Sequence, residues 1–265
     1  MQTKLKGVIF DVHDTLIPRS LTKTHDLGLL DKALKQKKIN YVIASNSVSQ
    51  PQRRLQQDLQ SAGLKLKEAS IITPTSLAIE WLQSNRVSSI QLFAPKEQLG
   101  YYKSFDLWIE TSKNPPDAVV VSNPPKDTLW KDLLSAISNL QKGSKLLVLH
   151  GNLISPSPEG YIPSCGFFMS ALAEITNDVV LLGKPAAYFF RVCLKQLGAQ
   201  SQEVLVVGDN YNIDILPALK LGMRTFWMTE EKDWKKSDQI SPHFWGNNND
   251  LLNLIEGQNQ PALEG

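Results

Sequence analysis

Short apolar runs recur along the chain, and each one ends in small or polar residues. The runs cover residues 7–10, 41–44, 118–121, 146–149, 179–182 and 204–207. Runs of this length that are rich in Val, Ile and Leu are typical of strands buried on both faces of a sheet. We therefore expect buried strands at these positions.

Helical patterns fill the intervals between the runs. They cover residues 27–38, 51–62, 73–82, 128–140 and 167–175. Strands that alternate with helices predict parallel βαβ units, and hence an α/β fold built on a doubly wound parallel sheet. Ligands bind such sheets beyond the carboxyl ends of the strands, so the residues that follow each run are the candidates for a functional site.

Side chains able to do chemistry follow four of the runs. They are Asp11 and His13 after the first run, Ser45 and Asn46 after the second, Lys184 after residues 179–182, and Asp209 and Asp214 after residues 204–207. Taken singly, an Asp or Ser at a strand end is often a turn or helix-cap residue. Their occurrence at four strand ends of one parallel-sheet pattern favours a shared site instead.

These residue types suit phosphoryl transfer through a covalent intermediate. Asp11 is the candidate nucleophile and would form an aspartyl phosphate. A carboxylate that approaches a phosphate dianion needs its repulsion neutralised, and Mg²⁺ held by Asp209 and Asp214 would do so. Lys184 would add a cation, and Ser45 a hydroxyl donor, to the transferring phosphoryl oxygens.

Composition narrows the class of protein and its partners. Of the 265 residues, 42% are hydrophobic and 20% charged, and the net charge is +2. A globular protein has this composition, and nothing in it predicts a nucleic acid or an anionic membrane as a partner. No run approaches the ~18 apolar residues of a membrane span, and the first run stops at Asp11, too early for a signal peptide. The two cysteines suit buried thiols in a reducing compartment, so we expect a cytoplasmic protein.

The polar strand ends resemble the four motifs of the haloacid dehalogenase superfamily. The first motif is matched by residues 11–16, the second by Ser45, the third by Lys184 and the fourth by Gly208-Asp209 with Asp214. The resemblance implies that Asp11 is the nucleophile. It also implies Mg²⁺ as cofactor, held by Asp11, the backbone carbonyl of His13, Asp209 and Asp214, with phosphate held by Ser45, Asn46 and Lys184.

One branch of this superfamily resembles the chain more closely. Residues 183–185, 208–215 and 221–225 are similar to the type IIA branch, which contains p-nitrophenyl phosphatases, pyridoxal phosphatases and NagD-like nucleotide phosphatases. The resemblance implies a Rossmann-like core with an α/β cap inserted between the second and third motifs. We accordingly expect a discontinuous core of residues 1–79 and 181–265, and a cap of residues 80–180.

The first motif departs from the family pattern at His13, where the family has a second Asp. By resemblance, the side chain at this position is the general acid toward the leaving group and then the base toward water. Imidazole titrates near neutral pH and can do both, whereas a poor substitute would leave a slow enzyme, because acid–base help is typically ~10²–10⁴-fold in rate. His25 is better explained as a turn or helix-start residue.

A second departure follows an expected cap strand. Where the branch usually has Thr-Asn-x-Asp, this chain has Leu149-His150-Gly151-Asn152. A loop that reaches over the active site would present His150 and Asn152 as candidates for substrate specificity. Other placements stay open because residues 155–160 loosen the register.

Two interpretations of the function result, one as an enzyme and one as a binding protein. The leading one is a cytoplasmic, Mg²⁺-dependent phosphatase of a small phosphorylated metabolite. The alternative is a catalytically impaired member that binds a phosphorylated ligand, motivated by His13. A dehalogenase or a phosphonate-cleaving enzyme ranks lower, since no Schiff-base lysine can be placed. The sequence does not choose the substrate, and a homodimer stays open because caps of this kind often supply dimer contacts.

Overall fold

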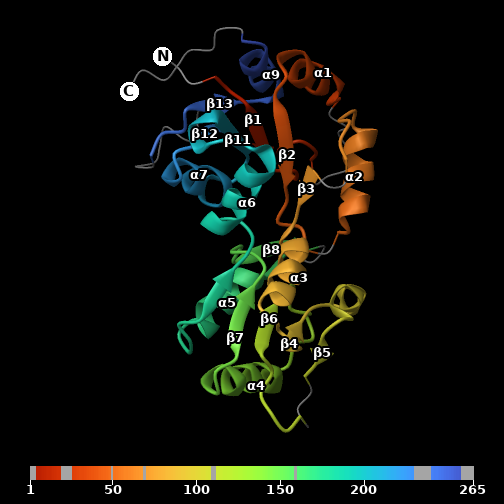
Figure 1. The fold of residues 1–265 in the computed structure, drawn as a ribbon, viewed down its shortest axis with the longest axis vertical. Helices are drawn as coiled ribbons and strands as arrows, with labels where there is room; N and C mark the ends of the chain where they lie inside the picture. Colours follow the sequence, from red (N-terminus) through yellow and green to blue (C-terminus); the bar gives the residue numbers. More distant parts are fainter. Residues whose placement is uncertain are drawn as a thin grey trace. The chain divides into compact units, whose positions relative to one another are not determined.

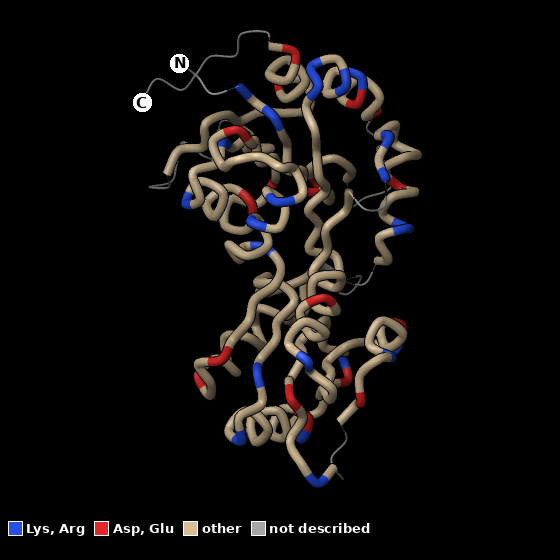
Figure 2. The backbone as a smooth tube through the Cα atoms, viewed as in Figure 1, with Lys and Arg blue, Asp and Glu red and all other residues tan. Residues whose placement is uncertain are grey.

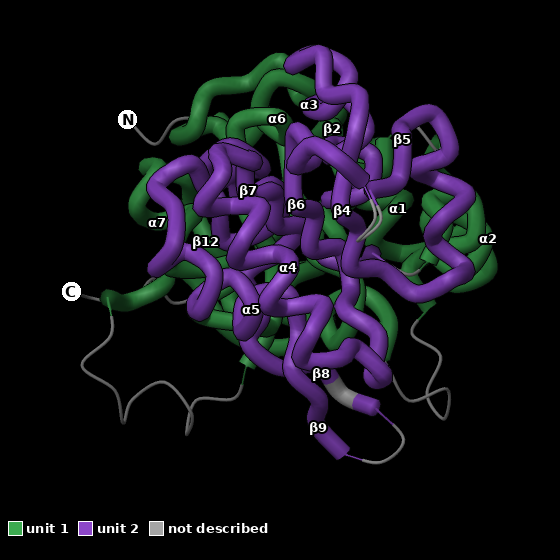
Figure 3. The backbone as a smooth tube through the Cα atoms, turned by 90° about the horizontal axis from the view of Figure 1, so that it is seen from below, with its two compact units in different colours: residues 1–45, 50–72, 190–265 green, residues 46–49, 73–189 purple. Residues whose placement is uncertain are grey.

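The computed structural model describes residues 4–18, 26–48, 50–67, 70–108, 112–157, 160–229 and 240–257, and His25 lies outside these ranges. The chain forms two compact units (Figure 3). The first unit comprises residues 1–45, 50–72 and 190–265, and the second comprises residues 46–49 and 73–189. The expected boundaries between core and cap, at residues 80 and 180, stay a prediction.

A parallel sheet forms the centre of the first unit (Figure 1). Its strand order is β13-β12-β11-β1-β2-β3, and every neighbouring pair is parallel. The strands are β1 (Gly7–Phe10), β2 (Asn40–Ala44), β3 (Ile71–Ile72), β11 (Val204–Gly208), β12 (Arg224–Met228) and β13 (Phe244–Gly246). The expected strands at residues 7–10, 41–44 and 204–207 are therefore confirmed, with β1 between β11 and β2.

Helices precede or follow the strands of this sheet along the chain. They are α1 (Gly28–Lys37), α2 (Gln52–Ser61), α6 (Ala187–Leu197), which begins in the second unit, α7 (Leu216–Lys220) and α9 (Asn248–Glu256). A short 3₁₀ turn (Ser201–Glu203) precedes β11, and a π-helical turn (Tyr211–Ile215) joins β11 to α7. Helices α1 and α9 pack against each other although they come from opposite ends of the chain.

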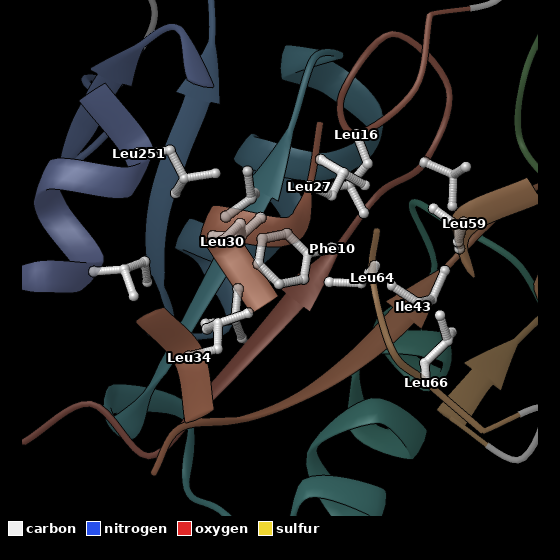
Figure 4. Close-up of a cluster of buried hydrophobic side chains, with 14 of the residues drawn as sticks. Phe10, Leu16, Leu27, Leu30, Leu34, Ile43, Leu59, Leu64, Leu66 and Leu251 are labelled. Atoms are coloured by element: carbon white, nitrogen blue, oxygen red, sulfur yellow. The ribbon is translucent and has the colours of Figure 1, made fainter. Parts of the chain in front are cut away.

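The core of the first unit is mostly aliphatic and surrounds Phe10 (Figure 4). Around it lie Leu16, Leu27, Leu30, Leu34, Ile43, Leu59, Leu64, Leu66 and Leu251. All four residues of β1 are buried, as expected for a strand covered on both faces. Apolar burial on this scale holds the carboxyl ends of the strands in place.

The second unit contains its own parallel sheet, in the order β10-β7-β6-β4-β5. Its strands are β4 (Ser89–Phe93), β5 (Asp106–Leu107), β6 (Ala118–Val121), β7 (Lys145–Val148) and β10 (Val179–Leu181). An antiparallel hairpin of β8 (Ile154–Ser157) and β9 (Gly160–Pro163) is separate. The helices are α3 (Pro74–Ser84), α4 (Trp130–Gln141) and α5 (Cys165–Leu172), with a 3₁₀ segment at Lys96–Tyr102.

The α/β class with parallel sheets is confirmed in both units. Strands β6, β7 and β10 lie where the sequence predicts them, whereas β4, β5 and the hairpin were not predicted. In the described part of the chain, no helix combines the length and the apolar character needed to cross a membrane.

Candidate active site

Three carboxylates converge at the carboxyl edge of the first unit's sheet. Asp11, Asp209 and Asp214 each offer an oxygen, and these oxygens lie within 4.8 Å of one another. Strands β1 and β11 pair Phe10 with Val207, so Asp11 and Asp209 follow neighbouring strand ends. Carboxylates this close repel one another unless a cation lies among them, and all-oxygen donors of this kind fit a hard divalent cation.

A tight turn after β1 orients the Asp11 carboxylate. Asp14 adopts a left-handed conformation with φ of 64°, and its N–H donates to the Ile17 carbonyl at 2.8 Å. The turn buries Thr15, which is 2% exposed. The Thr15 hydroxyl donates to Asp11 Oδ2 at 3.0 Å and lies 3.4 Å from Asp209 Oδ1. Thr15 was not assigned a role from the sequence, although it belongs to the first motif.

The segment after β11 brings Asp214 back toward the strand end. Asn210 accepts hydrogen bonds from the N–H groups of Asn212 and Ile213, both at 3.1 Å. Its own N–H donates to Asp214 Oδ2 at 3.2 Å. A Cβ on Gly208 would lie 2.5 Å from the Asp214 Cβ, so a glycine is needed for this close approach.

His13 and Ser45 lie in the same unit as the carboxylates. His13 is half-buried and its backbone forms an isolated parallel bridge with Ile17. Ser45 is fully buried after β2, where its N–H donates to the Ile72 carbonyl at 3.1 Å. Because β2 is the neighbour of β1, Ser45 and Asp11 follow adjacent strand ends.

The remaining candidates belong to the second unit and form a network of their own. Lys184 is 2% exposed. Its N–H donates to Asn46 Oδ1 at 2.9 Å, and Asn46 Nδ2 donates back to the Lys184 carbonyl at 2.9 Å. Asn46 Nδ2 also lies 3.0 Å from Asn152 Oδ1. The sequence did not predict that the Asn46 amide would hold the backbone of Lys184.

The two cap candidates differ in exposure. His150 is 5% exposed, and burial lowers its pKa to about 4. Its Nδ1 accepts a hydrogen bond from the Asn152 N–H at 3.3 Å, which requires the neutral ring. Asn152 is half-buried. A specificity role for either residue stays a prediction.

Known phosphatases are similar in sequence to this chain. Dihydroxyacetone phosphatase from Corynebacterium glutamicum (strain R) is 24% identical over 185 residues, which are 69% of this chain and 66% of that protein. Ribonucleotide monophosphatase NagD from Escherichia coli (strain K12) is 23% identical over 228 residues, 83% of this chain and 86% of that one.

Solved structures share the fold. The p-nitrophenyl phosphatase from Archaeoglobus fulgidus has a TM-score of 0.80 at 21% identity, covering 96% of this chain and 99% of that one.

Residues 5–222 match the family described as haloacid dehalogenase-like hydrolase. That match covers all four motifs and most of the chain, and so the protein belongs to the haloacid dehalogenase-like hydrolase family.

Proposed function

We propose that this chain is a phosphatase that hydrolyses a small phosphorylated metabolite through an aspartyl phosphate on Asp11. The observation that carries the proposal is the convergence of the Asp11, Asp209 and Asp214 oxygens within 4.8 Å. The names of the relatives give phosphatase activities on small phosphorylated substrates, which supports the same reaction class.

The proposed cofactor is Mg²⁺, held by the three carboxylates and the backbone carbonyl of His13. When bound, it supplies the positive charge that offsets the repulsion between the Asp11 carboxylate and a phosphate dianion. The oxygen-only donor set suits this ion better than a softer metal such as zinc, which prefers nitrogen and sulfur ligands.

Each remaining step is assigned to a side chain of the protein. An Asp11 carboxylate oxygen attacks phosphorus, and the bond from phosphorus to the leaving oxygen breaks. His13 donates a proton to that oxygen and then removes one from the water that hydrolyses the aspartyl phosphate. The Thr15 hydrogen bond to Asp11 Oδ2 restrains the carboxylate so that its other oxygen is the nucleophile.

Phosphate recognition is assigned to Ser45, Asn46 and Lys184. The Asn46 amide bonds both to the backbone N–H and to the carbonyl of Lys184, so we assign to it the positioning of the lysine as well. His150 and Asn152 are the proposed specificity residues. A cytoplasmic location belongs to the same proposal, supported by Cys165 and Cys193, which are buried and form no disulfide.

The proposal is tested by hydrolysis of p-nitrophenyl phosphate with and without Mg²⁺. We expect Mg²⁺-dependent turnover that Asp11→Asn abolishes, while the control Asp106→Asn, a change on an exposed residue of β5, leaves it unaltered. Trapping of radioactive phosphate on the wild-type protein, and its absence in Asp11→Asn, would locate the covalent step. Turnover that survives in Asp11→Asn would overturn the assignment.

A second candidate function rests on His13, which replaces the carboxylate expected there. In it, the chain binds a phosphorylated ligand with little or no turnover. The variant His13→Asp separates the two candidates. A large rise in turnover shows that the native residue limits catalysis, whereas a fall shows that the imidazole is a working acid and base. Saturable phosphate binding without turnover of a broad metabolite panel would favour the binding protein.

A further inference from the structure

A pocket with a volume of about 480 Å³ opens in the first unit, at the opposite end of β2 from Ser45. It lies between the end of α1, the first residues of β2, the segment after α2 and the end of α6. Strands rise about 3.3 Å per residue, so Tyr41 in this pocket is on the order of 13 Å along β2 from Ser45. The pocket is therefore separate from the candidate catalytic carboxylates.

Among the residues that the structure describes, four lysines and no acidic residue line this pocket. They are Lys35, Lys38, Lys65 and Lys67. Lys35 pairs with Asp31 at 2.5 Å, whereas the structure shows no carboxylate partner for the other three among the described residues. Figure 2 shows basic residues gathered along the tube at α1. Ammonium groups that share one concave surface raise the local positive potential, which attracts an anion of several charges.

A frame of hydrogen bonds holds the pocket in shape. Asp31 is 5% exposed and accepts from the Lys65 N–H at 3.1 Å. The Tyr41 hydroxyl lies 3.0 Å from the Lys65 carbonyl and 3.4 Å from Asp31 Oδ1. Burial and Asp31 raise the pKa of Tyr41, so the hydroxyl stays a donor. Lys65 and Lys67 are thus carried by an anchored segment.

The alternation of side chains in that segment directs both lysines outward. Leu64 and Leu66 are buried, while Lys65 and Lys67 between and after them are exposed. Cations at the end of α1 are explained by the helix dipole, which accounts for Lys35 and Lys38. The dipole does not account for Lys65 and Lys67, because they follow α2 in a non-helical segment.

The pocket also has an apolar wall, beside the polar side chains of Asn40, Ser70 and Gln196. Leu34, Ile39, Leu66, Leu197 and the Tyr41 ring contribute to the lining. Small-molecule sites commonly have volumes of about 300–1,000 Å³ and combine apolar walls with a few polar groups. We propose that this lysine-lined pocket is a second binding site of the chain, for an organic polyphosphate such as a nucleoside triphosphate. The phosphates lie against the lysines and the organic group lies against Tyr41 and the leucines.

The test is calorimetric titration of ATP into Asp11→Asn protein in EDTA, so that neither turnover nor Mg²⁺ at the catalytic site contributes. We expect saturable binding of one ATP per chain. The double variant Lys65→Gln/Lys67→Gln should weaken ATP binding about tenfold or more, which corresponds to ~1.4 kcal/mol or more. Lys38→Gln, on a different element, should weaken it by a similar factor. The matched control Lys103→Gln changes an exposed lysine of the second unit and should leave the affinity unaltered.

Three results would overturn the proposal. The first is an absence of saturable ATP binding to the parent protein, and the second is an equal loss of affinity in Lys103→Gln, which would indicate non-specific attraction. The third is tripolyphosphate binding as tightly as ATP, because an organic group that contacts the apolar wall must contribute affinity. Circular dichroism melts of each glutamine variant establish that it is folded, and the two variants on separate elements give independent readings.

Discussion

The indole Nε1 of Trp227 donates a hydrogen bond of 2.8 Å to the backbone carbonyl of Asp209. Strands β11 and β12 pair Gly208 with Trp227, so the bond spans the point where β11 ends. The Tyr211 ring packs on the indole with centroids 5.2 Å apart, and its hydroxyl donates to the Ile240 carbonyl at 2.8 Å. The backbone that carries Asp209 is therefore held by a side chain of the adjacent strand.

Replacing Trp227 by Phe should weaken Mg²⁺ binding. The ring stays in contact with Tyr211, but the Asp209 carbonyl loses its donor and the segment gains freedom. A neutral hydrogen bond is worth about 1 kcal/mol net, so we expect about a fivefold higher Kd for Mg²⁺. Calorimetric titration with Mg²⁺ measures this without turnover. Trp130→Phe is the control, because Trp130 is 71% exposed on α4. An unchanged Kd in Trp227→Phe would contradict a positioning role.

Two of the three carboxylates, those of Asp11 and Asp209, were predictable because their placement depends on strand ends alone. Parallel strands place their carboxyl ends at one edge, and Asp11 and Asp209 directly follow two buried runs. Trp227 could not be predicted in the same way. Its sequence context is that of an ordinary strand residue, and its bond to Asp209 depends on which strand neighbours β11.

Several features of the second unit leave no signal in the sequence pattern. The strand β5 has two residues, both exposed, and leaves no apolar run to detect. The family resemblance places His150 on a loop over the active site but gives no sign of the depth of its burial, which tertiary packing decides. Likewise, Asn46 follows β2 in sequence but bonds to Lys184 and Asn152, more than a hundred residues away.

Replacing Thr15 by Val should lower kcat while leaving the fold intact. Val has nearly the same shape but cannot donate to Asp11 Oδ2, so the nucleophile loses its orientation. A hydrogen bond to a charged group is worth about 1.5–3 kcal/mol, which corresponds to roughly a tenfold or larger loss of rate. Steady-state hydrolysis of p-nitrophenyl phosphate measures it. Thr15→Ser keeps the hydroxyl and should retain most of the rate; equal rates for all three proteins would refute the role.

Replacing Gly208 by Ala should remove the stabilisation that Mg²⁺ gives the protein. The new methyl group would lie 2.5 Å from Asp214 Cβ and 2.6 Å from its Cγ, so the carboxylate must move. We expect a lower Tm, since overpacking typically costs about 1–3 kcal/mol, and no rise in Tm on adding Mg²⁺. Gly100→Ala is the control, because no described atom lies within 4 Å of the place its methyl group would take. A normal Mg²⁺-induced rise in Gly208→Ala would show that Asp214 tolerates displacement.

The buried His150 ring should make the stability of the protein depend on pH. Burial lowers its pKa from 6.5 to about 4, so between these values the unfolded chain binds a proton that the folded chain does not. Stability therefore falls as pH drops through this window, by about 2 kcal/mol between about pH 7.5 and 5. Urea unfolding of wild type and His150→Asn, which keeps an acceptor for the Asn152 N–H, measures the difference at each pH. We expect the advantage of the wild type to shrink by that amount, because the asparagine does not titrate. A difference that is constant with pH would mean that the ring titrates equally in both states.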